Sequence, residues 1–312
     1  MNLNTQKFLK WAAILILAAL HLPSNATAQK SFDYDHQPHA PYDFTNLNLT
    51  LNIDSASTTI KGRAEYELQP KLEMRDTLIL HAAHMDIQEV LWNQKGIDYS
   101  IRNDSLLILP PEDLTPGETQ HLSIKYSAAT KFGIHKNHRG TMWTSLLPLS
   151  HRHWFPLFDY PGNRLTASLQ IESNNSSATV VATGDKNDDK NVWIHQQNVP
   201  ATAIGFAAGN FEESETMAGI KTVSLYNESG TITEEQKSKL LRESHSALTG
   251  TQKKLGIEYP YQSLSLVVLE DHKWEQKAYG AGIGFVYLNR GNLTEQIRRI
   301  IQAQWLGVNM RE

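Results

Sequence analysis

The chain has 312 residues, 29 Lys and Arg against 33 Asp and Glu, and no cysteine. A formal charge of -4 argues against a nucleic-acid partner, for which a basic face is expected. The missing thiols exclude disulfides and thiolate metal ligands. A chain of this length can bury one large core or two moderate ones, so its stability must come from packed apolar side chains.

The first 28 residues have the pattern of a secretory signal peptide. Lys7 and Lys10 precede a short apolar run at 11–22, and Ala26-Thr27-Ala28 offers the small residues that signal peptidase accepts. The alternative is a membrane anchor, but a span needs about 20 apolar residues and this run is shorter. We therefore expect cleavage after Ala28 and a secreted or periplasmic mature protein without a stable membrane anchor.

Residues 29–217 carry the pattern of β-strands. After a polar lead-in, Leu47, Leu49, Leu51 and Ile53 alternate with polar side chains, which predicts a strand with one buried face. Short runs separated by turn-forming residues then follow, as is typical of an all-β, sandwich-like domain. These runs lie at 60–68, 77–80, 106–109, 121–126, 165–171, 178–182, 192–195 and 203–207.

From residue 218 onward, helix and strand patterns mix. Thr233 and Gln236 have the spacing of a capping box, which predicts a helix that ends near Leu255. Strands are expected at 221–226, 264–269 and 284–288, and a second helix from about Thr294. The chain should thus be mostly β and then α+β, with a signal peptide at 1–28, a β domain at 29–217 and an α+β domain at 218–312.

Four local motifs resemble the aminopeptidase N family of zinc metallopeptidases. The most specific is residues 154–161, W-F-P-L-F-D-Y-P, which resembles the family's F-P-x-F-D-x-P segment. The others are 49–62, like its first hairpin, 206–211, like the strand that closes its β domain, and 255–261, like its F-G-x-x-Y-P segment. The resemblance covers roughly residues 40–312. It implies a saddle-shaped N-terminal β domain followed by the beginning of a thermolysin-like catalytic domain.

The same resemblance implies a degenerate zinc site. The family binds zinc through an H-E-x-x-H helix, in which two His ligands lie four positions apart and the Glu activates the metal-bound water. Residues 304–307, Q-W-L-G, resemble the end of that motif, and counting back aligns Arg299, Ile300 and Ala303 with the His, the Glu and the second His. None of these side chains can be a ligand or a base.

The family's substrate-binding carboxylates are also replaced. Its G-x-M-E-N loop, which holds the substrate's amino group, aligns with Gly280, Ala281, Gly282, Ile283 and Gly284, so Ile283 stands at the Glu. Its Q-x-E in the β domain aligns with residues 145–147, S-L-L. The family's third zinc ligand lies in a later helix, past residue 312, so the catalytic-like domain is expected to be truncated.

Histidines are densest at His135, His138, His151 and His153. Short His spacings can build a metal site, but no evident carboxylate partner lies between these residues. A hydrogen-bonded or solvent-exposed His is therefore the favoured interpretation, and a metal site is the alternative.

Two further patterns concern calcium binding and serine hydrolase chemistry. Asp185, Asp188 and Asp189 resemble part of a calcium loop, but Lys186 interrupts it and the bidentate Glu of an EF-hand is missing, so a polar hairpin turn is expected. The sequence has no G-x-S-x-G elbow of a serine hydrolase. Enzyme function thus has no support beyond analogy of fold.

These observations favour an exported, non-catalytic aminopeptidase N-like protein, a pseudoenzyme that acts as a binding or structural module. No cofactor is expected, and the expected partner is a peptide or a protein. The first alternative is part of a working zinc aminopeptidase system, either as a fragment of a longer chain or with an unrecognised site. The second is a decayed gene product.

Overall fold

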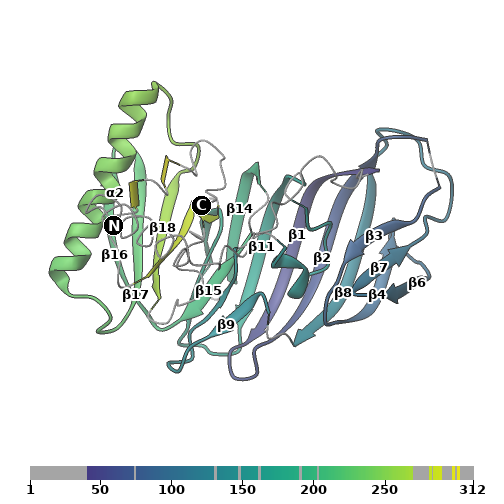
Figure 1. Cartoon of the computed structure of the whole chain (residues 1–312), viewed down its shortest axis with the longest axis horizontal. Helices are drawn as coiled ribbons and strands as arrows, with labels where there is room; N and C mark the ends of the chain where they lie inside the picture. Colours follow the sequence, from purple (N-terminus) through teal and green to yellow (C-terminus); the bar gives the residue numbers. More distant parts are fainter. Residues whose placement is uncertain are drawn as a thin grey trace, which may run out of the picture. The chain divides into compact units, whose positions relative to one another are not determined.

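An eight-stranded sheet forms the largest part of the fold, with the order β13-β14-β11-β1-β2-β8-β4-β5 (Figure 1). Its strands are β1 Tyr42–Asp54, β2 Thr59–Pro70, β4 Met85–Trp92, β5 Lys95–Gly96, β8 Gln120–Ala129, β11 Leu165–Ser173, β13 Asp185–Asp189 and β14 Val192–Ala201. Strand β1 pairs antiparallel with β2 and parallel with β11. Its alternating Leu47, Leu49 and Leu51 are all at most 1% exposed, so one face of the sheet is buried.

The computed structural model describes residues 41–73, 75–129, 132–146, 149–160, 163–189, 192–201, 204–269, 281–282, 284–289, 297–298 and 301–302. All of them lie in one compact unit, Ala40–Glu312. The expected signal peptide lies outside the described residues. Among the described residues, no helix combines the length and apolar character needed to cross a bilayer.

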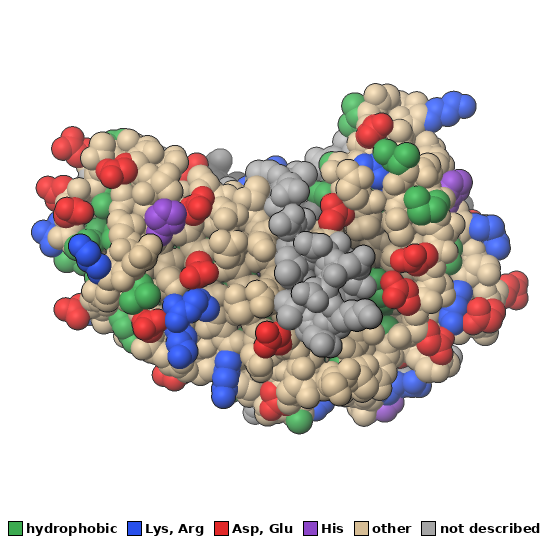
Figure 2. All heavy atoms as spheres, turned by 180° about the vertical axis from the view of Figure 1, so that it is seen from behind, with side chains coloured by type: hydrophobic (Ala, Val, Ile, Leu, Met, Phe, Trp, Pro, Cys, Tyr) green, Lys and Arg blue, Asp and Glu red, His purple; other side chains and the backbone are tan. Residues whose placement is uncertain are grey.

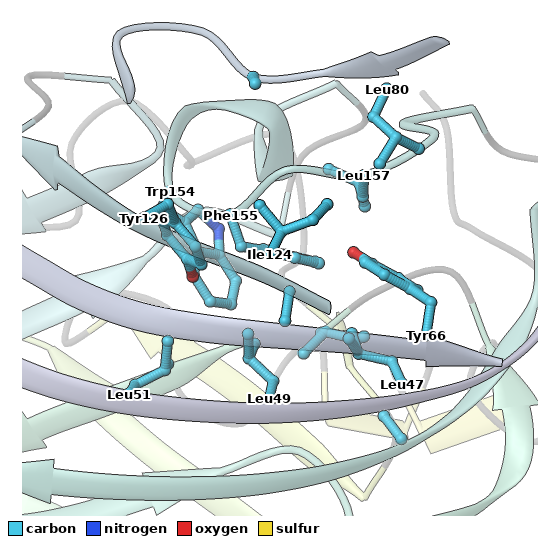
Figure 3. Close-up of a cluster of buried hydrophobic side chains, with 14 of the residues drawn as sticks. Leu47, Leu49, Leu51, Tyr66, Leu80, Ile124, Tyr126, Trp154, Phe155 and Leu157 are labelled. Atoms are coloured by element: carbon cyan, nitrogen blue, oxygen red, sulfur yellow. The ribbon is translucent and has the colours of Figure 1, made fainter. Parts of the chain in front are cut away.

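Two smaller sheets contribute to the core beside the buried face. One has the order β3-β7-β6, with β3 Leu78–His81, β6 Tyr99–Arg102 and β7 Ser105–Ile108. The other has the order β12-β15-β10-β9, with β9 Ile134–Lys136, β10 Met142–Thr144, β12 Thr179–Ala182 and β15 Phe206–Gly209. Figure 3 shows Leu49 and Leu51 of the large sheet on one side of this core and Leu80, Trp154 and Leu157 on the other.

The second part of the chain forms a five-stranded sheet with the order β16-β17-β18-β20-β19. Its elements are β16 Phe211–Ala218, β17 Lys221–Glu228, β18 Ser263–Leu269, β19 Ala281–Gly282 and β20 Phe285–Asn289, together with helix α2 Glu234–Leu255. Leu264, Leu266 and Val268 of β18 share an apolar cluster with Leu240 and Leu248 of α2.

The other face of this sheet packs against the first part of the chain. Val267 and Leu269, which alternate with the residues that contact α2, share a cluster with Tyr226 and with Trp143 and Val181 of the β12-β15-β10-β9 sheet. Strand β18 is therefore buried on both faces, which explains its continuous apolar sequence.

Most of the expected elements are confirmed. The expectation of a mostly β fold followed by α+β holds, and each expected strand overlaps an observed one. The expected strands are 44–53, 60–68, 77–80, 106–109, 121–126, 165–171, 178–182, 192–195, 203–207, 221–226, 264–269 and 284–288. The four described residues of the second expected helix, 297–298 and 301–302, are helical. The domain boundary between 217 and 218 stays a prediction; it falls within the β16–β17 hairpin.

Strands β4, β5, β6, β9, β10, β16 and β19 are not predicted from the sequence, and β13 replaces an expected turn. A local reason is evident for three of these strands. The turn expected at the Asp185 to Asp189 segment is wrong: these residues form strand β13, which pairs with β14, because pairing of the backbone overrides a polar sequence. Strand β4 was not expected, since a register shift between Ile87 and Glu89 interrupts its alternation. Strand β16 was not expected because its sequence, FEESETMA, is acidic.

The start of α2 gives a test of the capping box. The Thr233 side chain accepts a hydrogen bond from Gln236 N at 3.2 Å, and the Gln236 side chain accepts one from Thr233 N at 2.8 Å. We expect Thr233→Ala to lower the free energy of unfolding by about 1 kcal/mol, because a helix N–H loses its partner. Thr233→Ser keeps the oxygen and should stay close to the unmodified protein in urea unfolding. Equal stability of the Ala and Ser variants would contradict this role.

Candidate functional site

The segment that aligns with the family's amine-binding loop lies at an edge of the five-stranded sheet. Ala281 and Gly282 form β19, which pairs antiparallel with Val286 and Phe285 of β20. Gly280 and Ile283 lie outside the described residues. Among the described strands, only β20 pairs with β19, so the outer side of β19 is a sheet edge. Backbone amides at such an edge can pair with an added strand.

Gly284 fixes the turn between β19 and β20. Its φ is +60°, and a Cβ at this position would lie 2.8 Å from the backbone oxygen of Ser263. Its own backbone oxygen accepts a hydrogen bond from Ser265 N at 2.6 Å. A glycine is thus required here both by the left-handed backbone and by the close approach of β18.

The positions that align with the zinc motif, Arg299, Ile300 and Ala303, lie outside the described residues. Their neighbours Ile297 and Ile301 are at most 1% exposed and share the apolar cluster of α2. Gln302 Nε2 donates to Thr251 Oγ1 of α2 at 3.3 Å. The described residues of this helix are therefore held against α2 by apolar packing.

The F-P-x-F-D segment is a buried structural segment. Trp154 and Phe155 are fully buried, and Tyr66 Oη donates to the Pro156 oxygen at 2.5 Å. The Asp159 carboxylate accepts hydrogen bonds from Arg152 N and Arg152 Nε, both at 3.1 Å. Within the described residues, this motif thus anchors the short helix η2, His151–His153, beneath the β sheets.

Asp159 is the charged centre of this anchor. Burial raises its pKa, but the His151 imidazole, with Nδ1 3.7 Å from Oδ1, and the Arg152 guanidinium outweigh burial and lower the pKa to about 2. The Asp159 N–H donates to His81 Nδ1 at 3.2 Å. Burial, and then the charge of Arg152, lower the pKa of His81. The cluster favours an ionised carboxylate beside a neutral His81.

The four clustered histidines do not share one environment. His135 is buried beside Trp143, with ring centroids 5.6 Å apart, and burial lowers its pKa to about 4. His151 Nε2 accepts a hydrogen bond from Ile204 N at 3.2 Å, and His153 stacks on His84 with ring centroids 5.8 Å apart. His138 is exposed in the turn between β9 and β10. The His-rich sequence is thus spread over separate structural positions.

Two further residues noted in the sequence, Leu146 and Asp185, have structural contacts. Leu146, from the S-L-L that aligns with the family's Q-x-E, is 8% exposed and lies in the cluster between the two sheets, whereas Leu147 is outside the described residues. Asp185, from the calcium-like sequence, accepts hydrogen bonds from Ser263 N and Oγ at 3.0 Å. It links β13 to the start of β18.

Sequence reasoning missed a buried carboxylate at Glu228. It is 2% exposed, and its Oε1 accepts hydrogen bonds from Asn137 Nδ2 at 2.7 Å and from the Thr141 hydroxyl. Asn137 Oδ1 in turn accepts from Arg139 N and Thr141 N, which closes the β9–β10 turn. Glu228 therefore fastens this turn to the end of β17. No periodic pattern marks such a residue, because its partners lie about 90 positions away.

Residues 36–204, more than half of the chain, match the peptidase M1 N-terminal domain. The chain belongs to the M1 peptidase family. This M1 chain is 25% identical over 209 residues to leucine aminopeptidase 2 of Yarrowia lipolytica, a match that covers 61% of this chain and 32% of that protein. It therefore spans about a third of the length of this relative. The resemblance inferred from the four motifs is confirmed.

Solved structures of M1 proteins share this fold. Native leukotriene A4 hydrolase from Saccharomyces cerevisiae superposes with a TM-score of 0.73 at 18% identity, over 89% of this chain and 47% of the other. The M1 zinc metallopeptidase from Deinococcus radiodurans gives a TM-score of 0.66 at 18% identity, over 86% and 64%. The similarity extends beyond the β part into the α+β part.

The residues that the sequence aligns with the M1 zinc motif are not of the types that hold zinc, and this alignment stays a prediction. Zinc in proteins is held by Cys, His or carboxylate ligands, and Arg299, Ile300 and Ala303 supply a fixed positive charge and two hydrocarbon side chains. In the described part of the chain, no three His, Asp or Glu side chains come together as a metal-binding group.

Asp159 should make stability depend on pH. Because its folded pKa of about 2 lies below the ordinary value of 3.8, its stabilisation is present above pH 3.8 and is lost as the pH falls toward 2. The shift corresponds to about 2 kcal/mol. We expect Asp159→Asn to flatten the unfolding free energy measured between pH 4 and pH 2. Asp86→Asn, which changes an exposed carboxylate of β4, is the control; equal effects of the two changes would contradict the assignment.

Substitutions at two glycines distinguish the cost of backbone strain from the cost of close packing. Gly219 has a φ of +70° with no atom within 4 Å of a built Cβ, whereas Gly284 combines a φ of +60° with the Ser263 oxygen at 2.8 Å. Gly219→Ala should cost about 1 kcal/mol from backbone strain alone. Gly284→Ala should cost at least about 1 kcal/mol more, because β18 must shift. Thermal unfolding that ranks them the other way would show that the approach is not tight.

Proposed function

We propose that this M1-family chain binds an extended peptide or protein segment and does not hydrolyse it. The observation that carries the proposal is the sheet edge at β19, formed by Ala281 and Gly282 where the family holds its substrate. A peptide can add there as a further strand through backbone hydrogen bonds. The sequence has only Ala and Gly at these positions, the two smallest residue types.

The replaced residues support binding without cleavage. Hydrolysis by zinc needs a metal-bound water and a base that accepts its proton. Arg299, Ile300 and Ala303 supply neither ligands nor a base at the aligned positions. Ile283 and Leu147 stand where carboxylates pair with a free amino group, so desolvation of that ammonium would be uncompensated.

A working zinc aminopeptidase system is the second candidate. It is favoured by the M1 family itself and by the leucine aminopeptidases among the curated relatives. In that case this chain would act as part of a longer polypeptide or use a site that the family motifs do not reveal.

We further propose that the protein is exported. Lys7 and Lys10, the apolar run and Ala26-Thr27-Ala28 form the three parts of a signal peptide. N-terminal sequencing of the protein secreted by its host should start at Gln29. The mildly negative charge suits a peptide-binding more than a nucleic-acid-binding role, and acidic and basic side chains are interspersed on the face in Figure 2.

Activity assays separate the two candidates. Aminoacyl fluorogenic substrates, with and without added zinc, should give no turnover above a no-protein blank. The triple change Arg299→His, Ile300→Glu and Ala303→His should not restore efficient cleavage, because Ile283 and Leu147 still leave the amino group unpaired. Turnover by the unmodified chain that a chelator abolishes would establish the aminopeptidase alternative.

Peptide binding is tested at β19 itself. Proline removes a backbone N–H, and neighbouring residues in a strand direct their N–H groups to opposite edges. Of Ala281→Pro and Gly282→Pro, one should therefore weaken binding of a fluorescent peptide library in anisotropy, and the other should lower the unfolding midpoint by breaking a β20 bond. Ala281→Val keeps the N–H and is the control. Unchanged peptide binding by both proline variants would refute strand addition at β19.

A further inference from the structure

Strand β6 is an exposed edge of the β3-β7-β6 sheet. It pairs antiparallel with β7 from Tyr99 opposite Ile108 to Arg102 opposite Ser105, and in the described part of the chain no strand pairs with its other side. Figure 1 shows β6 at the end of the fold farthest from α2. Ile101 is 49% exposed there, which is unusual for an isoleucine in a strand.

The sequence of this edge is complementary to itself. Residues 98–102 read D-Y-S-I-R. If a second copy pairs antiparallel with Ser100 opposite Ser100, Asp98 of each copy lies opposite Arg102 of the other, and Tyr99 lies opposite Ile101. Both matches occur twice by symmetry. Opposite charges and aromatic to β-branched pairs are the cross-strand combinations that stabilise sheets.

The charges of this edge are available for such a match. Asp98, Ser100 and Arg102 are exposed, and neither Asp98 nor Arg102 has an ion pair or side-chain hydrogen bond within the described residues. Because side chains alternate along a strand, Ser100 and Arg102 share one face and Tyr99 and Ile101 share the other. Asp98 directly precedes β6, and it joins the face of Ser100 and Arg102 if pairing extends the strand by one residue. A self-paired edge would thus have a polar face and an apolar face.

Charged residues on edge strands more often prevent pairing with another chain. The arrangement of the charges therefore decides whether this edge repels a second copy or binds it. Parallel pairing would place Asp98 beside Asp98 and Arg102 beside Arg102. An antiparallel pairing shifted by one residue would leave neither charge opposite a charge: Asp98 would face Ile101 or Asn103, and Arg102 would face Ile97 or Tyr99. Only the register centred on Ser100 joins opposite charges and covers Ile101 at the same time.

We propose that two copies of this chain associate through β6 in that register, joining their small sheets into one six-stranded sheet in the order β3-β7-β6-β6-β7-β3. The contact is short, so the dimer is weak and forms at high protein concentration. It depends on the two Asp98–Arg102 pairs for register, and salt weakens it because both charges are exposed. The association is independent of peptide binding at β19.

Charge reversals test the register directly. Sedimentation velocity of the purified protein up to about 1 mM should show a monomer–dimer equilibrium. Asp98→Arg and Arg102→Asp each place like charges opposite one another in the homodimer, and each should raise the dimer Kd by roughly tenfold or more. Mixing the two variants should restore the dimer, because the mixed pair has opposite charges at both contacts. The double variant Asp98→Arg with Arg102→Asp should also restore it.

Lys61→Glu, which reverses an exposed charge on β2, is the matched control and should leave the dimer Kd unchanged. Far-ultraviolet circular dichroism checks that every variant is folded, and recovery in the mixture shows that loss of the dimer does not reflect misfolding. A monomer at all concentrations overturns the proposal. So does a dimer that both single variants retain, since that dimer would use another surface.

Discussion

The second part of the fold depends on the burial of β18 on both faces. Leu264, Leu266 and Val268 contact the cluster of α2, while Val267 and Leu269 contact side chains of the β12-β15-β10-β9 sheet. Since β17 pairs parallel with β18, the connection between them must cross over the sheet, and α2 is that crossover. On the face opposite α2, Tyr287 of β20 packs in the cluster of Val267, and its hydroxyl donates to the Phe206 oxygen at 2.7 Å.

Buried carboxylates fasten loops to this framework. Asp159 holds η2 through Arg152, and Glu228 holds the β9–β10 turn through Asn137 and Thr141. Removing a charge from water is costly, and at Asp159 this cost is offset because Arg152 and His151 converge on one carboxylate. In both places an acidic residue that could be read as part of a reactive site serves to position the backbone.

The sequence predicts best those elements whose period and end signals agree. Strand β1 alternates without interruption from Leu47 to Ile53, and the capping box at Thr233 places the start of α2 correctly. The prediction is weaker where tertiary pairing decides, as in β13, whose polar residues become a strand because β14 lies beside them. A bulge conceals β4, and acidic side chains conceal β16.

In the candidate site, too, the sequence predicts some features, and others follow only from tertiary contacts. The motif W-F-P-L-F-D-Y-P identified the family from sequence, yet the roles of Asp159 and Arg152 follow only from their three-dimensional contacts. Clustering in sequence left a metal site at His135, His138, His151 and His153 as the alternative interpretation. In the structure His135 lies in β9, His138 in the β9–β10 turn, and His151 and His153 in η2, each with different contacts. Arg299, Ile300 and Ala303 remain predictions from alignment, since they lie outside the described residues.

The exposed sheet edges differ in the side chains that they present, and this difference argues for distinct roles. Glu213 and Glu215 are exposed along β16, so a second copy of that strand would bring like charges together. Strand β19 has only Ala281 and Gly282, which favour recognition through the backbone rather than through side chains. Strand β6 ends in Arg102 and is directly preceded by Asp98, and this pair of opposite charges favours its own copy. Peptide binding and self-association therefore need not compete, because each uses an edge that the other leaves open.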